Sequence, residues 1–205
     1  MTSSPADPAR DLPAGAEIVR RPPLAGRSIV LVGMMGAGKS SIGRRLGQRL
    51  GLPFADSDSE IEKAAQLSVE DIFELYGEAH FRDGERRVIR RLLEGPPQVL
   101  ATGGGAYMDP ETRALVSDRG VSVWLDADLD LLHRRVSRRG NRPLLKTGEP
   151  RAVLERLLAL RNPVYALADL HILSDHGPIE TTVEEILSAL SRWTGRAAGA
   201  EPSDC

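Results

Sequence analysis

Short, mostly apolar runs alternate with longer amphipathic stretches along this 205-residue chain. The short runs predict strands at residues 29–32, 53–58, 98–102, 121–125 and 170–173. The longer stretches repeat apolar residues at helical spacing and predict helices at residues 41–50, 60–66, 68–76, 78–93, 110–118, 129–138, 151–167 and 182–193. Strands that alternate with helices predict an α/β fold, in which helices cover both faces of a parallel sheet.

Local signals refine the ends of these elements. Ser59 is expected to cap the helix that starts at residue 60, and the Ser-x-x-Asp pattern at residues 68–71 is typical of a helix start. Gly77 is expected to end the helix that follows. Pro163 should kink the helix over residues 151–167 or mark a new start, because proline lacks the backbone N–H.

The alternation is confined to residues 27–194, which we therefore predict to be a single domain. Residues 1–26 are rich in Pro, Ala, Arg and Asp without apolar periodicity, and predict a flexible arm. Residues 195–205 predict a second disordered tail. Residues 140–150 are polar and contain Gly, Pro and Asn, so we expect a loop there.

A glycine loop lies between the first strand and its helix. Residues 33–40 fit the phosphate-binding pattern G-x-x-x-x-G-K-[ST], and the order strand, loop, helix is the context that this motif requires. The backbone N–H groups of such a loop surround phosphate oxygens, the lysine reaches the β- and γ-phosphates, and the serine hydroxyl can ligate Mg²⁺. The alternative, a glycine-rich turn that binds nothing, does not explain the lysine, the serine and both flanks. The predicted nucleotide-binding residues of the loop and helix start are Gly36, Ala37, Gly38, Lys39, Ser40 and Ser41.

Two further features follow predicted strands. Asp56 and Asp58 end the second strand, where they would share one face if the strand continues, and residues 103–105 are three consecutive glycines after the third. Ligands of parallel sheets bind at the carboxyl ends of the strands, so these features and the glycine loop should meet at one edge. Taken alone, the two aspartates would suit ordinary helix capping.

Composition narrows the function classes. The net charge of −2 gives no reason to expect nucleic acid or an anionic membrane as a partner. One cysteine, Cys205, excludes an intrachain disulfide and suits a reducing compartment. The chain has no apolar run long enough to span a membrane and no secretion signal, so we expect a cytoplasmic protein. The four histidines show no metal-ligand spacing.

The motifs together resemble the shikimate kinases, small phosphate-loop kinases of the nucleoside monophosphate kinase type. The stretches that carry the likeness are residues 33–43, 56–58, 71–73, 77–82, 85, 102–105, 141–145 and 161–165. The first is shared by many nucleotide-binding proteins, whereas the ordered combination of the later ones is specific.

The resemblance implies a phosphate-loop NTPase fold with five parallel strands in the order 2-3-1-4-5 and a mobile lid at about residues 139–150. It implies transfer of the γ-phosphoryl group of ATP to the 3-hydroxyl of shikimate, on the pathway to chorismate and the aromatic amino acids. ATP would be the co-substrate, Mg²⁺ the cofactor, and the protein a monomer without nucleic acid or membrane partners.

The resemblance also implies roles for single residues. Asp56 would hold Mg²⁺ through water, and Asp58 would bind the acceptor hydroxyls and take the proton. Arg142 in the lid would reach the transferred phosphates, and Arg135 would pack on adenine, although Arg134, Arg138 and Arg139 leave its register open.

The remaining implied contacts concern the acceptor. Arg82 and Arg161 would bind its carboxylate, for which the planar guanidinium is suited. Glu85 would orient Arg82. Gly103, Gly104 and Gly105 would let backbone N–H groups approach the acceptor, and Phe73 and Phe81 would wall its ring or simply pack in the core.

Two other functions remain open at this point. One is a kinase for another small polyol acid such as gluconate, which would share the loop but not the acceptor contacts. The other is a regulator that binds ATP without chemistry, and the presence of Asp58, Arg82 and Arg161 argues against it.

Overall fold

The structure is a computed structural model and describes residues 24, 26–137, 149–175 and 177–194. The predicted arm and C-terminal tail, and nearly all of the predicted lid with Arg142, lie outside these residues. None of the described helices is both long and apolar enough to cross a bilayer.

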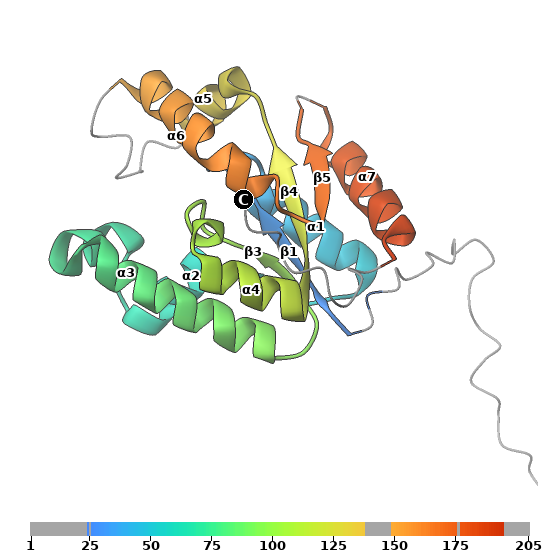
Figure 1. The fold of residues 1–205 in the computed structure, drawn as a ribbon, viewed down its shortest axis with the longest axis horizontal. Helices are drawn as coiled ribbons and strands as arrows, with labels where there is room; N and C mark the ends of the chain where they lie inside the picture. Colours follow the sequence, from blue (N-terminus) through green and yellow to red (C-terminus); the bar gives the residue numbers. More distant parts are fainter. Residues whose placement is uncertain (1–23, 25, 138–148, 176, 195–205) are drawn as a thin grey trace, which may run out of the picture.

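Five parallel strands form one sheet in the order β2-β3-β1-β4-β5, which confirms the predicted fold class and strand order (Figure 1). The strands are β1 (Ser28–Val32), β2 (Phe54–Asp56), β3 (Val99–Ala101), β4 (Gly120–Asp126) and β5 (Leu170–Leu173). Strand β1 is central and pairs with β3 on one side and β4 on the other. All residues of β1 and β3 are buried, as expected for strands covered on both faces.

Helices cover both faces of this sheet (Figure 1). They are α1 (Lys39–Leu50), α2 (Ser57–Ala65), α3 (Val69–Glu94), α4 (Pro110–Arg119), α5 (Leu129–Ser137), α6 (Pro150–Tyr165) and α7 (Ile179–Arg192), with a short 3₁₀ turn η1 (Ala106–Met108). Helix α1 packs beside α7, and α3 packs beside α4. Leu31 lies against Gly43 of α1, whereas its neighbour Val30 lies on the side of Val116 in α4. Since successive strand residues point to opposite faces, the two helix pairs lie on opposite sides of the sheet.

The boundary between β2 and α2 differs from the prediction. Strand β2 ends at Asp56 and α2 begins at Ser57, so Asp58 lies in the first turn of a helix and not on the strand. The cap of α2 is Asp56, whose side chain accepts from the Asp58 N–H, and not Ser59. The early helix start follows from this cap, because the carboxylate satisfies an N–H that would otherwise have no partner.

The two helix-breaking signals had different outcomes. Gly77 does interrupt α3, with φ 80° and ψ 172° inside an otherwise helical span. By contrast, α6 continues through Pro163 and ends two residues later at Tyr165. A proline so close to the end removes little of the hydrogen-bond ladder, and the buried side chains Leu157, Arg161 and Tyr165, four residues apart, hold this last part of α6 on the core.

Candidate active site

The glycine loop connects β1 to α1 at the carboxyl end of the central strand. Gly36 and Gly38 have φ angles of 86° and 99°, a left-handed conformation that favours glycine. Helix α1 begins directly after Gly38, so the partial positive charge of its N-terminus lies at the loop. The combination is the anion-binding geometry that the sequence motif predicted.

The Lys39 side chain is buried against this loop. Its Nζ atom donates to the carbonyl oxygens of Gly33, at 2.7 Å, and Met34, at 2.9 Å. The ammonium group is therefore held beside the phosphate-binding loop by the loop's own backbone.

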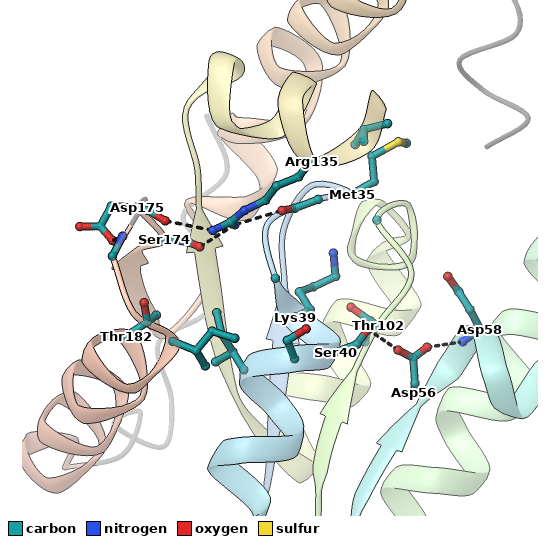
Figure 2. A pocket seen from close by; sticks show the side chains of 18 residues that line it. Met35, Lys39, Ser40, Asp56, Asp58, Thr102, Arg135, Ser174, Asp175 and Thr182 are labelled. Atoms are coloured by element: carbon teal, nitrogen blue, oxygen red, sulfur yellow. Dashed lines mark hydrogen bonds between the residues drawn. The ribbon is translucent and has the colours of Figure 1, made fainter. Parts of the chain in front are cut away.

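Ser40, Asp56 and Asp58 form a connected group beside the loop, shown in Figure 2. The Ser40 hydroxyl donates to Oδ2 of Asp56 at 2.6 Å, and the Asp58 N–H donates to Oδ1 of Asp56 at 3.1 Å. Asp56 thus caps α2 and contacts the end of the glycine loop at the same time, so the capping and the functional interpretation of this residue are compatible. A hydroxyl and a carboxylate are hard oxygen donors, which suit Mg²⁺.

The glycine loop and the group around Asp56 line a first cavity, whose opposite wall comes from α5 and the residues after β5 (Figure 2). Arg135 donates to the Gly36 carbonyl at 3.2 Å and to the Asp175 carbonyl at 3.0 Å. Its exposed neighbour Arg134 is not among the lining residues, so of these two arginines it is Arg135 that faces the cavity. Ser174, which the sequence analysis did not single out, donates its hydroxyl to the Ala37 carbonyl at 2.8 Å.

A second, smaller cavity adjoins the first. The residues that line it come from the glycine loop, α2, α3, α6 and the triple-glycine turn: Met35, Asp58, Val69, Phe73, Phe81, Arg82, Glu85, Gly103, Gly104, Gly105 and Arg161. Met35, Asp58 and Gly104 line both cavities. Phe73 and Phe81 also pack in a small core cluster with ring centroids 4.5 Å apart, so the core interpretation of these rings is confirmed, while contact with the ring of an acceptor stays a prediction.

Arg82 and Glu85 form an ion pair in the wall of the second cavity. Nη1 of Arg82 lies 2.7 Å from Oε2 of Glu85, whose side chain is 3% exposed. Burial raises the pKa of the Glu85 carboxyl, and the positive charge and hydrogen bond of Arg82 oppose this effect without cancelling it. Among the described residues, Oε1 of Glu85 has no hydrogen-bond partner.

The raised pKa of Glu85 predicts a pH-dependent effect of Glu85→Gln on stability. The folded protein holds this proton more tightly than the unfolded chain, so the stability that it contributes is lost as the pH rises through the folded pKa. Glutamine does not titrate, so the free energy of unfolding of the variant relative to the wild type should increase from pH 4.5 to pH 8, by about 1.4 kcal/mol for each unit of pKa shift. Urea unfolding at both pH values measures it.

Glu78→Gln is the matched control for this measurement, because Glu78 contacts the same arginine with a side chain that is 62% exposed. Comparison with this variant separates the effect of the buried carboxylate from the loss of a carboxylate contact to Arg82. If the free energy of unfolding of Glu85→Gln relative to the wild type stays constant or falls from pH 4.5 to pH 8, the pKa of Glu85 is not raised in the folded protein.

The triple-glycine turn is packed too closely for side chains. A Cβ on Gly103 would lie 2.5 Å from Oε1 of Glu85 and 2.8 Å from Oδ1 of Asp58, and one on Gly105 would lie 2.6 Å from both terminal nitrogens of Arg82. The expectation for the Gly103 N–H needs correction, because it donates to the fully buried Ser57 hydroxyl at 3.0 Å and is not available to an acceptor molecule. Gly103 matters instead because a larger residue would displace two carboxylates.

We expect Gly105→Ala to weaken binding of the acceptor selectively. The added methyl group displaces the guanidinium of Arg82, which is the mobile end of a long side chain, so the fold should be retained. The KM for the acceptor should rise about tenfold or more, since a charge-assisted contact contributes about 1.5–3 kcal/mol. The KM for the nucleotide should stay within about twofold.

Gly84→Ala serves as its control, because Gly84 lies in α3 beside the same cavity wall and a Cβ there meets nothing within 4 Å. This variant should keep both KM values and gain about 1 kcal/mol of stability from helix propensity. If Gly105→Ala leaves the KM for the acceptor unchanged, the turn does not position Arg82 for that molecule.

Comparison with known proteins decides the family. The family model described as shikimate kinase matches residues 35–191. The chain belongs to the shikimate kinase family. A shikimate kinase of Bradyrhizobium diazoefficiens is 56% identical over 182 residues, or 88% of each chain. A shikimate kinase of Brucella canis is 54% identical over 168 residues, which cover 82% of this chain and 84% of the relative.

Solved structures agree with the shikimate kinase assignment. A shikimate kinase from Acinetobacter baumannii in complex with shikimate has a TM-score of 0.77 at 39% identity, covering 79% of this chain and 91% of the other. A gluconokinase from Sinorhizobium meliloti has a TM-score of 0.55 at 21% identity, with coverage of 82% and 93%, and shares the fold alone. The resemblance to the shikimate kinases that the motifs indicated is confirmed, and the chain is a transferase of the phosphate-loop kinase class.

Proposed function

We propose that this chain transfers the γ-phosphoryl group of ATP to the 3-hydroxyl of shikimate, giving shikimate 3-phosphate and ADP. The observation that carries the proposal is the position of Asp58 and Gly104, which line both the cavity at the phosphate-binding loop and the cavity at the two arginines. A donor in the first cavity and an acceptor in the second would meet at Asp58.

The first cavity suits the triphosphate. Lys39, the N–H groups of residues 36–41 and the N-terminus of α1 supply positive charge without any acidic residue in the first turn of α1. Phosphoryl transfer depends mainly on alignment and charge stabilisation, and these groups offer both. Arg135 on α5 is proposed to pack on the base, and Arg142 to approach the transferred group from the lid.

Mg²⁺ fits the oxygen donors beside this loop. The Ser40 hydroxyl would ligate the ion directly and Asp56 through a water molecule, a mode suited to Mg²⁺ because it retains several of its waters. When bound, the ion neutralises charge on the β- and γ-phosphate oxygens.

The second cavity suits a small polyol with one carboxylate. Arg82 and Arg161 reach it from α3 and α6, and a carboxylate accepts paired hydrogen bonds from a guanidinium. The buried Glu85 holds Arg82 and adds negative charge that disfavours a second anionic group on the acceptor.

Asp58 is the proposed base. The 3-hydroxyl oxygen forms a bond to the γ-phosphorus while the bond from that phosphorus to the β,γ-bridging oxygen breaks. The hydroxyl proton passes to the Asp58 carboxylate, and ADP leaves with the bridging oxygen.

An acceptor assay tests the proposal. Purified protein with ATP and Mg²⁺ is offered shikimate, gluconate and nucleoside monophosphates, and ADP formation is followed. Turnover with shikimate alone supports the proposal. Turnover with gluconate and not with shikimate would establish the alternative, which the structural likeness supports at the level of fold only.

We further propose that the protein acts as a cytoplasmic monomer, without nucleic acid or a membrane as partner. In support, a single cysteine suits a reducing compartment, and the net charge of −2 gives no reason to expect nucleic acid or an anionic membrane as a partner. Sedimentation equilibrium in the presence of ATP and shikimate tests the oligomeric state.

A further inference from the structure

Two side chains of α6 meet on one carbonyl group of the triple-glycine turn. The Tyr165 hydroxyl donates to the Gly104 carbonyl oxygen, and Nη1 of Arg161, one helical turn earlier, donates to the same oxygen at 3.2 Å. Gly104 and Arg161 line the second cavity, whereas Tyr165 lies behind them and is fully buried. Tyr165 therefore contacts the wall of the cavity without facing its interior.

The hydrogen bond to Gly104 fixes a whole peptide unit. The described chain has no cis peptide bonds, so the Gly104 carbonyl and the Gly105 N–H point in opposite directions across a rigid plane. Gly105 in turn lies against the guanidinium of Arg82. Holding the Gly104 carbonyl thus fixes the orientation of a backbone segment that contacts both arginines proposed to bind the acceptor.

The hydroxyl group of Tyr165 is itself held in place by the protein core. Its ring stacks on Trp124 of β4, with centroids 6.1 Å apart and an angle of 29° between the planes. Burial raises the pKa of Tyr165 to about 12, although the charge of Arg161 acts in the opposite direction. The phenol consequently keeps its proton at neutral pH and remains a hydrogen-bond donor.

We propose that Tyr165 is a positioning residue for the acceptor: it holds the Gly104–Gly105 peptide and shares the Gly104 carbonyl with Arg161, so that the remaining guanidinium donors of Arg161 are presented to the acceptor carboxylate. The proposal rests on the function proposed above and gives a role to Tyr165, which lies in a family motif but had none assigned. Without the hydroxyl, the Gly104 carbonyl depends on Arg161 alone, and the guanidinium is drawn toward the turn.

Tyr165→Phe tests the proposal, since it keeps the ring and removes only the donor. We expect the KM for shikimate to rise about five- to tenfold, the effect of one hydrogen bond to an otherwise satisfied group. The KM for ATP should stay within about twofold, and kcat should fall less than the KM rises. Steady-state kinetics with each substrate varied in turn provides all three values.

Tyr107→Phe is the matched control. Tyr107 is also buried, and its hydroxyl donates to Ser122 rather than to the turn. A loss of stability common to both variants with no change in the KM for shikimate would mean that Tyr165 has a structural role only, which overturns the proposal. A rise in the KM for shikimate in Tyr165→Phe and not in Tyr107→Phe supports it.

Two further outcomes are decisive. If the wild-type protein does not phosphorylate shikimate, the proposed function fails, whereas an active wild type with an unchanged Tyr165→Phe variant contradicts only the role of Tyr165.

Tyr165→Met is the second variant if Tyr165→Phe does not fold. If both are unfolded at the assay temperature, the hydroxyl is required for folding and a role limited to acceptor positioning is wrong.

Discussion

Replacing Asp58 with asparagine is expected to lower kcat by about 10²–10⁴-fold, the usual contribution of a positioned general base. Asparagine has nearly the same shape and can still hydrogen-bond the acceptor, but its amide cannot take the hydroxyl proton. The dissociation constant of ATP should change less than about twofold, because the contacts of the phosphate-binding loop are untouched. Calorimetric titration with ATP and a coupled ADP assay give the two quantities.

Asp118→Asn is a suitable control, because Asp118 lies on α4 with a side chain that is 69% exposed. It should match the wild type in both measurements. An Asp58→Asn variant that turns over at the wild-type rate would remove the proposed base from the mechanism.

Lys39→Met should give the other large effect. Methionine retains the apolar stem of the side chain and removes the ammonium group, which in the structure lies between the Gly33 and Met34 carbonyls beside the loop. Loss of one preorganised charge at the transferred group typically lowers kcat by about 10²–10³-fold, and ATP binding should weaken as well. The affinity for shikimate measured without nucleotide should remain within about twofold, since Lys39 does not line the second cavity.

Lys63→Met controls for the loss of a positive charge, because Lys63 pairs with Glu60 on α2 with a side chain that is 72% exposed. Its kinetic constants should equal those of the wild type. If Lys39→Met weakens shikimate binding as strongly as ATP binding, the two cavities are not the separate donor and acceptor sites proposed here.

The regular part of the fold could be predicted from the sequence because it depends on local patterns. Runs such as residues 29–32 are buried on both sides and leave an uninterrupted apolar signal, and the helices between them force the parallel arrangement. The glycine loop could also be predicted, because its two fixed glycines, its lysine and its serine lie within eight consecutive residues.

The parts that escaped prediction depend on contacts between distant residues. Ser57 lies between two aspartates and resembles any helix-start serine, yet its hydroxyl accepts from Gly103, 46 residues away. Ser174 and Tyr165 contact backbone carbonyls 137 and 61 residues away. Neither the periodicity nor the spacing of residues in the sequence indicates such partners. The early end of β2 could not be predicted either, because it depends on the Asp56 carboxylate capping α2 in place of Ser59.

The position of Trp124 has a consequence for spectroscopy. Its indole stacks on Tyr165 behind the second cavity and on His171, at 4.3 Å, and it lies against Gly33 at the start of the phosphate-binding loop. The chain has two tryptophans, so substitution of Trp193 leaves Trp124 as the single tryptophan, beside the phosphate-binding loop and Tyr165. Its emission offers a label-free signal with which the order of substrate binding can be followed in a stopped-flow instrument.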